Sequence, residues 1–82
     1  MDLVKLTEEI VKSMVKEPDL VTVKQISTDE EDTTLIQVMV DDSDKGAIIG
    51  KGGRNANAIR TIVQASAYIN NLKRVRVNID SF

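Results

Sequence analysis

The residues best suited to do chemistry are the glycines and cations that follow an apolar pair, in the stretch Ile48-Ile49-Gly50-Lys51-Gly52-Gly53-Arg54. Glycine allows positive φ angles and lets another molecule approach the main chain without meeting a Cβ. Two of the flanking side chains carry positive charge. If a helix begins at Gly53 or Arg54, its unpaired amides and the positive end of its dipole point into the turn. Such a turn suits a phosphate.

A G-x-x-G spacing is weak evidence alone, because an average glycine usage of about 7% produces one by chance in roughly a third of chains of this length. Two related glycine motifs are excluded. A phosphate-binding P-loop needs a hydroxyl directly after its lysine, and Gly52 follows Lys51. A dinucleotide fingerprint started at Gly50 needs glycine where Asn55 stands. The apolar run into the turn and the amphipathic segment after it therefore have to carry the interpretation.

The composition argues against an enzyme or a metal protein. The chain has no histidine and no cysteine, so it lacks the common general base near neutral pH, a thiol nucleophile and an imidazole ligand. The acidic run 29–32 is interpreted as a solvated turn. The segment 41–46 fails as a calcium loop, because Lys45 holds its fifth position and Gly52 its twelfth. We expect no catalytic residue, no metal and no cofactor.

A chain of 82 residues predicts a single domain, residues 1–82, with a modest core. The absence of cysteine fits a reducing cytosol. Neither an apolar run of membrane-spanning length nor the basic and apolar regions of a signal peptide is present. These features predict a cytoplasmic protein with no membrane partner.

Charge is unevenly spread along the chain. The net charge is −2, but residues 1–42 hold four lysines against eleven acids, or −7, whereas residues 43–82 hold seven Lys or Arg against two acids, or +5. We expect one acidic and one basic face, with the glycine turn on the basic one. With so few cations, binding to a polyanion should be moderate and sensitive to salt.

Periodicity predicts the elements that position the turn. Apolar spacing indicates helices, and alternation with β-branched residues indicates strands. Pro18 should end the first helix, and Ser43 or Asp42 should cap the second. The expected order is a helix 2–16, a strand 20–26, a strand 33–40, a helix ending at 49, a helix 54–70 and a strand 74–79.

The predicted helix 54–70 carries more apolar surface than one buried face requires, about 200° of its circumference at about 100° per residue. The excess would pack against a second subunit, with Ile62 and Ile69 as candidate contacts. The alternative is that small alanines simply tolerate solvent.

The segment 46–54 followed by Ile59-Arg60 resembles a KH domain, and the order αββααβ resembles the type II form. This resemblance implies an α+β fold, with a three-stranded mixed sheet and helices packed on one face. A lone KH domain of this size is similar to the small bacterial KhpA family of RNA-binding proteins. That family implies a cytoplasmic RNA-binding or RNA-chaperone protein that pairs with itself or with a larger KH-containing partner.

The resemblance also implies a site. A KH domain clamps the backbone of about four nucleotides of single-stranded nucleic acid through its G-x-x-G loop. Carried onto this chain, the clamp is Gly50, Lys51, Gly52 and Gly53, with Arg54 beside it. Ile48 and Ile49 are candidates for the core and the groove floor respectively, although spacing alone does not assign them. Asn57 and Arg60 could reach a base edge or a phosphate, or simply face solvent.

The choice of ligand stays open between single-stranded RNA and single-stranded DNA. Tyr68 and Phe82 are the only aromatic residues, too few for a sheet surface that stacks successive bases. An aliphatic groove with hydrogen bonds is expected instead. The rival hypothesis is a KH fold kept as a protein-interaction module with little or no nucleic-acid binding.

Overall fold

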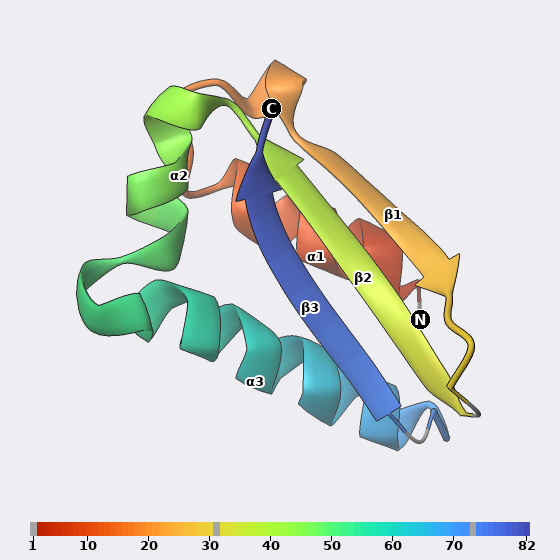
Figure 1. Cartoon of the computed structure of the whole chain (residues 1–82). Helices are drawn as coiled ribbons and strands as arrows, with labels where there is room; N and C mark the ends of the chain where they lie inside the picture. The colour runs from red at the N-terminus through yellow and green to blue at the C-terminus, as the bar shows by residue number, and fades with distance from the viewer. Residues whose placement is uncertain (1, 31, 73) are drawn as a thin grey trace.

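The sheet has three strands and mixed direction (Figure 1). In the computed structural model, which describes residues 2–30, 32–72 and 74–82, β1 (Thr22–Ser27) pairs antiparallel with β2 (Thr33–Val40). Strand β3 (Arg74–Ser81) lies parallel to β2 on its other side. A parallel neighbour needs a crossover connection, and two helices provide it.

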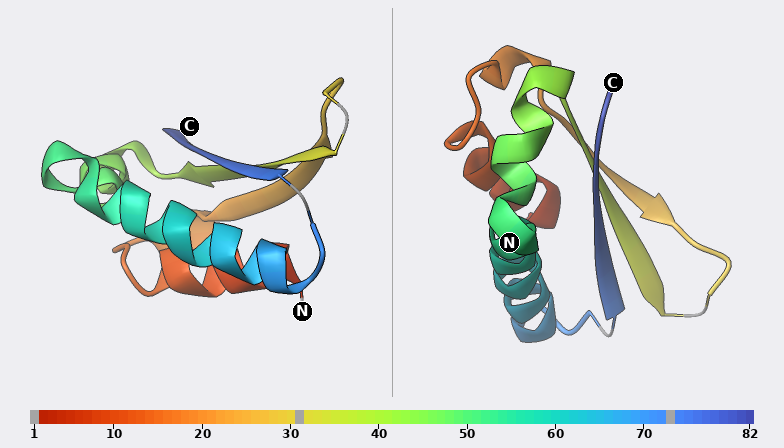
Figure 2. Two further views of the ribbon diagram at one scale, coloured as in Figure 1. Left: turned by 90° about the horizontal axis from the view of Figure 1, so that it is seen from below. Right: turned by 60° about the vertical axis from the view of Figure 1, so that its left-hand side comes forward.

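The helices cover one face of this sheet (Figure 2). Two short 3₁₀ turns, η1 and η2, interrupt the connections between the regular elements. The described helical elements are α1 (Leu3–Lys12), η1 (Pro18–Leu20), α2 (Asp42–Ile49), η2 (Lys51–Gly53) and α3 (Arg54–Ile69). The predicted α+β fold with the order αββααβ is confirmed.

The core lies between the helices and alternate residues of the strands. Ile36, Val38 and Val40 of β2 are fully buried, and Val75, Val77 and Ile79 of β3 are nearly so. The helices contribute Leu3, Val11, Ile48, Ala56, Ile59, Val63 and Ala67. The period of two along the strands thus turns one set of β-branched side chains inward, as their alternation predicted.

Several predicted boundaries were wrong. Helix α1 ends not at Lys16 but at Lys12, where the amide of Met14 bonds to the carbonyl of Val11 at 3.0 Å and so tightens the last turn to a 3₁₀ turn. Pro18 therefore begins η1 instead of ending α1, and β1 starts at Thr22. The cap of α2 is Asp41, whose carboxylate accepts the amide of Ser43 at 3.2 Å. Helix α3 ends at Ile69, and β3 extends to Ser81.

One buried carboxylate ties α2 to the segment after α1. Asp44 is 1% exposed, and its two oxygens accept the amides of Lys16 and Glu17, both at 3.0 Å. Charge-assisted bonds of this kind satisfy a buried carboxylate that would otherwise be costly. Asp44 is therefore a structural clamp that fixes α2 on the domain.

Candidate nucleic-acid interface

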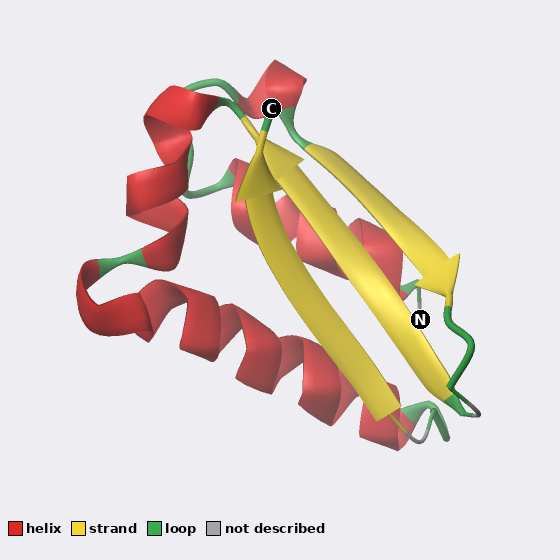
Figure 3. Ribbon diagram, viewed as in Figure 1, coloured by secondary structure: helices red, strands yellow, loops and turns green. Residues whose placement is uncertain are grey.

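The glycine turn joins α2 to α3 in a conformation that side chains disfavour (Figure 3). Gly50, Gly52 and Gly53 have φ angles of 75°, 65° and 80°. Inside η2, Gly52 leaves the helical region, and Gly53 is left-handed where it precedes α3. The three glycines are thus required by the backbone path, as the sequence predicted for the turn.

Gly50 is also required for space. A Cβ built on it would lie 2.8 Å from Cγ of Asn55. That side chain is itself fixed, since its Nδ2 donates to the carbonyl of Ala47 at 2.8 Å. Asn55 thus satisfies a carbonyl in the last turn of α2 and holds the turn from inside. This role cannot be predicted from the sequence, because an asparagine that caps a neighbouring helix has no signal that distinguishes it from other polar surface residues.

The outer side of the turn is open and positive. Lys51, Gly52 and Arg54 are exposed, and a Cβ on Gly52 would meet nothing within 4 Å. Gly53 offers no side chain to cap α3, and the first turn of α3 carries no acidic residue. The positive end of the α3 dipole therefore coincides with two cations. This arrangement attracts a phosphate.

The two isoleucines before the turn face different ways. Ile48 is completely buried, so the structure assigns it to the core, and Ile49 is half-buried. One turn before Ile49, Lys45 reaches from α2 to Asp80 on β3, with its Nζ 3.1 Å from Oδ1. Ile49 therefore lies on the flank of α2 that faces β3 and can line a groove beside the turn.

The same contact shifts the titration of Asp80. The amide of Ser81 donates a hydrogen bond to the Asp80 carboxyl, and the ammonium of Lys45 lies beside it. Together they hold the pKa of that carboxyl below its usual value. The carboxylate is therefore the form present at neutral pH, and its ion pair with Lys45 links α2 to β3.

Asn57 and Arg60 lie side by side on the first two turns of α3. Nη1 of Arg60 is 3.4 Å from Oδ1 of Asn57, and its Nε donates to the carbonyl of Val77 on β3 at 3.1 Å. Arg60 is half-buried and Asn57 is exposed. The structure thus brings both predicted residues onto the flank that continues from the turn, and Arg60 additionally links α3 to the sheet.

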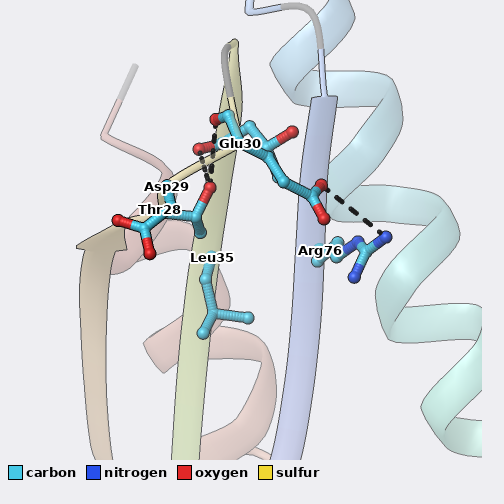
Figure 4. Close-up of a pocket in the computed structure, with 6 residues that line it drawn as sticks. Thr28, Asp29, Glu30, Leu35 and Arg76 are labelled. Carbon is cyan, nitrogen blue, oxygen red and sulfur yellow. Dashed lines mark hydrogen bonds and ion pairs between the residues drawn. The ribbon is translucent and has the colours of Figure 1, made fainter.

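The predicted division into an acidic and a basic face is incomplete. Arg76, from the basic half of the sequence, lies 3.9 Å from Glu30 of the acidic hairpin. These residues border a hollow of about 260 Å³ that Thr28, Asp29, Thr33 and Leu35 also line (Figure 4). The hairpin lies at the other end of the sheet from the glycine turn (Figure 1). The strand pairing, which the charge count ignores, brings the two halves together here.

Two further classes of site gain no support from the geometry. No cluster of three or more His, Cys, Asp or Glu that could hold a metal occurs in ranges 2–30, 32–72 and 74–82. Over the same part of the chain, no helix combines the length and apolar character that a bilayer span requires.

Comparison with known families identifies the domain. The family model for the KH domain of KhpA/KhpB matches residues 4–79. The chain belongs to the KhpA/KhpB family of KH domains. It is 43% identical over 74 residues to the RNA-binding protein KhpA of Clostridium acetobutylicum, covering 90% of this chain and 95% of that one. It is 42% identical over 76 residues to KhpA of Borreliella burgdorferi, and the match covers 93% of this chain and 89% of that one.

Solved structures support the fold of this KhpA/KhpB family member. Its structure resembles part of Era from Aquifex aeolicus, solved with GDP and aluminium fluoride, with a TM-score of 0.69 at 20% identity. The match covers 98% of this chain and 30% of the Era chain. Era solved with nucleotides 1506–1542 of 16S ribosomal RNA matches with a TM-score of 0.68 at 19% identity. That match covers 96% of this chain and 29% of the Era chain. At such identities the likeness concerns the fold alone.

Proposed function

We propose that this KH domain binds single-stranded RNA through Gly50, Lys51, Gly52 and Gly53. The observation that carries the proposal is the turn itself, in which three glycines with positive φ lie next to exposed cations at the start of α3. Relatives about 40% identical are named RNA-binding proteins, and a structural neighbour was solved with ribosomal RNA. We also propose that it acts in the cytoplasm, as expected for a relative of bacterial RNA-binding proteins.

In the proposed binding mode, different residues contact the sugar–phosphate backbone and the bases of the RNA. Amides of the turn and the Lys51 ammonium hold successive phosphates, which positions the strand without reading its sequence. Bases lie against the aliphatic side chain of Ile49, while Asn57 and Arg60 offer hydrogen bonds to base edges or to a further phosphate. Because aliphatic contacts discriminate poorly between bases, selectivity should be weak. Weak selectivity suits a general RNA chaperone, and acceleration of RNA strand annealing would measure that role.

A double substitution tests the proposal. Lys51→Asp with Gly52→Asp replaces the central cation and adds carboxylates where phosphates are expected. The fold should persist, because a Cβ at Gly52 meets nothing and aspartate tolerates a left-handed backbone better than most residues. We expect RNA affinity to be lost in a filter-binding assay, with an unchanged circular dichroism spectrum.

The comparison should use matched RNA and DNA pools of short single strands. A wild-type preference for RNA would indicate recognition of the 2′-hydroxyl, and equal affinities would indicate backbone recognition common to both. Unchanged RNA affinity in the folded double variant would contradict the proposal. So would backbone amide signals of residues 48–54 that do not move when RNA is titrated into the wild-type protein.

We further propose that the domain pairs with a second copy or with a larger KH-containing protein through α3. Ile62 and Ile69 are 46% and 78% exposed, and their spacing of seven residues places them on one flank. Large exposed apolar side chains at that spacing are typical of a helix that packs against another helix. This pairing would coexist with RNA binding, because the glycine turn lies at the other end of α3.

A further inference from the structure

A row of polar side chains follows α3 along the edge of the sheet. Asn57, Arg60, Gln64 and Tyr68 are spaced three or four residues apart, so they share one flank of the helix. Two of them bond to β3, Arg60 to the carbonyl of Val77 and Gln64 to the carbonyl of Val75, at 3.1 and 3.3 Å. The polar row therefore begins in the first turn of α3 after the glycine turn and runs along β3 for about 16 Å.

The polar row ends in a hollow between α3 and the beginning of β3. It encloses about 360 Å³, and Gln64, Tyr68, Leu72, Arg74 and Arg76 line it. Tyr68 is 82% exposed, and both arginine residues are also exposed. Both aromatic residues of the chain are exposed, but of the two only Tyr68 lines this hollow together with the arginine residues.

This combination matches a nucleotide in both charge and shape. Proteins that hold single strands pair cations that track the backbone with aromatic rings on which bases stack. We propose that RNA held at the glycine turn continues along the polar row and stacks a base on Tyr68, with flanking phosphates at Arg74 and Arg76. This second contact rests on the proposed RNA binding and extends the bound strand beyond the about four nucleotides that a KH loop clamps.

Acidic side chains of the hairpin between β1 and β2 oppose the second contact, and Glu30 is the one paired with an arginine. Glu30 lies 3.9 Å from Arg76, with both side chains more than half exposed. Its carboxylate repels phosphate and competes for the guanidinium, so Arg74 carries more of the attraction than Arg76. Removal of this acid by Glu30→Gln should therefore strengthen the binding of long RNA.

The hollow adjoins the surface proposed for subunit pairing, because Tyr68 and Ile69 line a neighbouring hollow together. Ile62 and Ile69 lie roughly 140° around α3 from the polar row, on the other side of its buried face. A protein partner at Tyr68 would have to supply acidic groups for the two arginines. Effects on RNA affinity and on self-association are therefore separable by measurement.

Affinity measured with two lengths of RNA tests the inference. A uridine tetranucleotide fills only the turn, whereas an oligouridine roughly three times as long also reaches Tyr68. We expect Tyr68→Ala to weaken the binding of the long RNA on the order of fivefold or more and to leave the tetranucleotide affinity unchanged. Tyr68→Phe should retain the affinity, and Arg74→Gln should lower the salt dependence by about one phosphate contact. Phe82→Ala removes the other exposed aromatic residue and serves as the matched control.

The wild-type protein supplies a direct signal. Tyr68 is its single tyrosine and it has no tryptophan, so its intrinsic emission reports on this ring alone. After correction for absorption by RNA, the long oligonucleotide should quench the emission and the tetranucleotide should not.

Distinct results would overturn the inference or the function on which it rests. If Tyr68→Ala and Arg74→Gln bind long RNA like the wild type, while the Lys51 and Gly52 double variant does not bind, the strand ends at the turn. A Tyr68→Ala variant that changes self-association and leaves RNA affinity intact would assign the ring to a protein contact. Equal wild-type affinity for both RNA lengths would also refute the second contact. Failure of the wild-type protein to bind either RNA would instead refute the proposed function itself.

Discussion

Two glycines of the turn perform different tasks although their φ angles are similar. At Gly50 the space that a Cβ would need is filled by Asn55, so this glycine lets the turn pack on itself. At Gly52 the corresponding space is empty, so this glycine leaves the main chain open to a ligand. Gly50 is therefore constrained by packing within the turn, and Gly52 by the access of a ligand to the main chain.

Replacement of Gly50 tests this distinction. Gly50→Ala combines a disfavoured positive φ with a contact of 2.8 Å to Asn55, so we expect a loss of about 1–3 kcal/mol in the free energy of unfolding. Urea denaturation measures the change. Gly46→Ala is the matched control, because Gly46 lies within α2 with nothing near its missing Cβ. That substitution should stabilise the protein by about 0.5–1 kcal/mol, and equal stability of the two variants would refute the assignment.

What the sequence reveals about single residues depends on whether their partners are local. The strained glycines were predictable, because they reflect the immediate backbone path. The roles of Asn55 and Asp44 were not predictable. Asn55 caps a neighbouring helix and Asp44 bonds to an amide 28 residues away, and neither contact leaves a periodic pattern in the sequence. The role of Ile48 as a core residue became clear only when α2 was placed against the sheet.

Helix α2 carries the glycine turn at its end, but it is short. Its eight residues include only two buried side chains, Asp44 and Ile48. The amides of Lys16 and Glu17 hold the Asp44 carboxylate, so the link between α2 and the segment after α1 is mainly polar. The position of the proposed RNA site therefore depends on a buried carboxylate that has a structural role and no proposed contact with RNA.

Loss of this clamp should cost substantial stability. Asp44→Ala leaves two part-buried amides without their acceptor, at about 1–3 kcal/mol for each unsatisfied group. We expect the free energy of unfolding to fall by roughly 2–4 kcal/mol in urea denaturation. Asp44→Asn retains one acceptor and should fall between the wild type and the alanine variant.

Asp42 provides the control for Asp44 on the same helix. Its carboxylate is exposed and accepts one bond from the hydroxyl of Ser81 at 3.1 Å. Asp42→Ala should therefore change stability by less than about 1 kcal/mol. If both alanine variants lose the same amount, the Asp44 carboxylate is not a clamp.

The elements themselves were largely readable from the sequence. Alternation in 33–40 and 74–79 located two strands correctly, and the apolar period located α3 to within one residue. The end of α1 was missed because Met14 and Val15 continue its apolar pattern, although the helix has already ended in a 3₁₀ turn at Met14. Apolar spacing indicates which side chains are buried, and it does not show where the backbone changes direction.

Across the molecule, α3 separates two kinds of surface. Its buried face of Ala56, Ile59, Val63 and Ala67 packs against the rest of the domain. On one side of that face lies the polar row beside β3, and on the other lie Ile62 and Ile69. This arrangement allows a second subunit and an RNA strand to occupy the same helix together.

Charge placed on the apolar flank tests this separation. Ile62→Glu with Ile69→Glu should shift the protein from dimer to monomer in sedimentation equilibrium at high micromolar concentration, because carboxylates would be buried against the partner. Leu20→Glu is the control, since Leu20 is equally exposed in η1 and remote from α3. Affinity for the uridine tetranucleotide should stay within about twofold of the wild type, because the glycine turn that holds it loses no phosphate contact. A wild-type protein that is already strictly monomeric, or a double variant that stays dimeric, would remove α3 as the site of pairing.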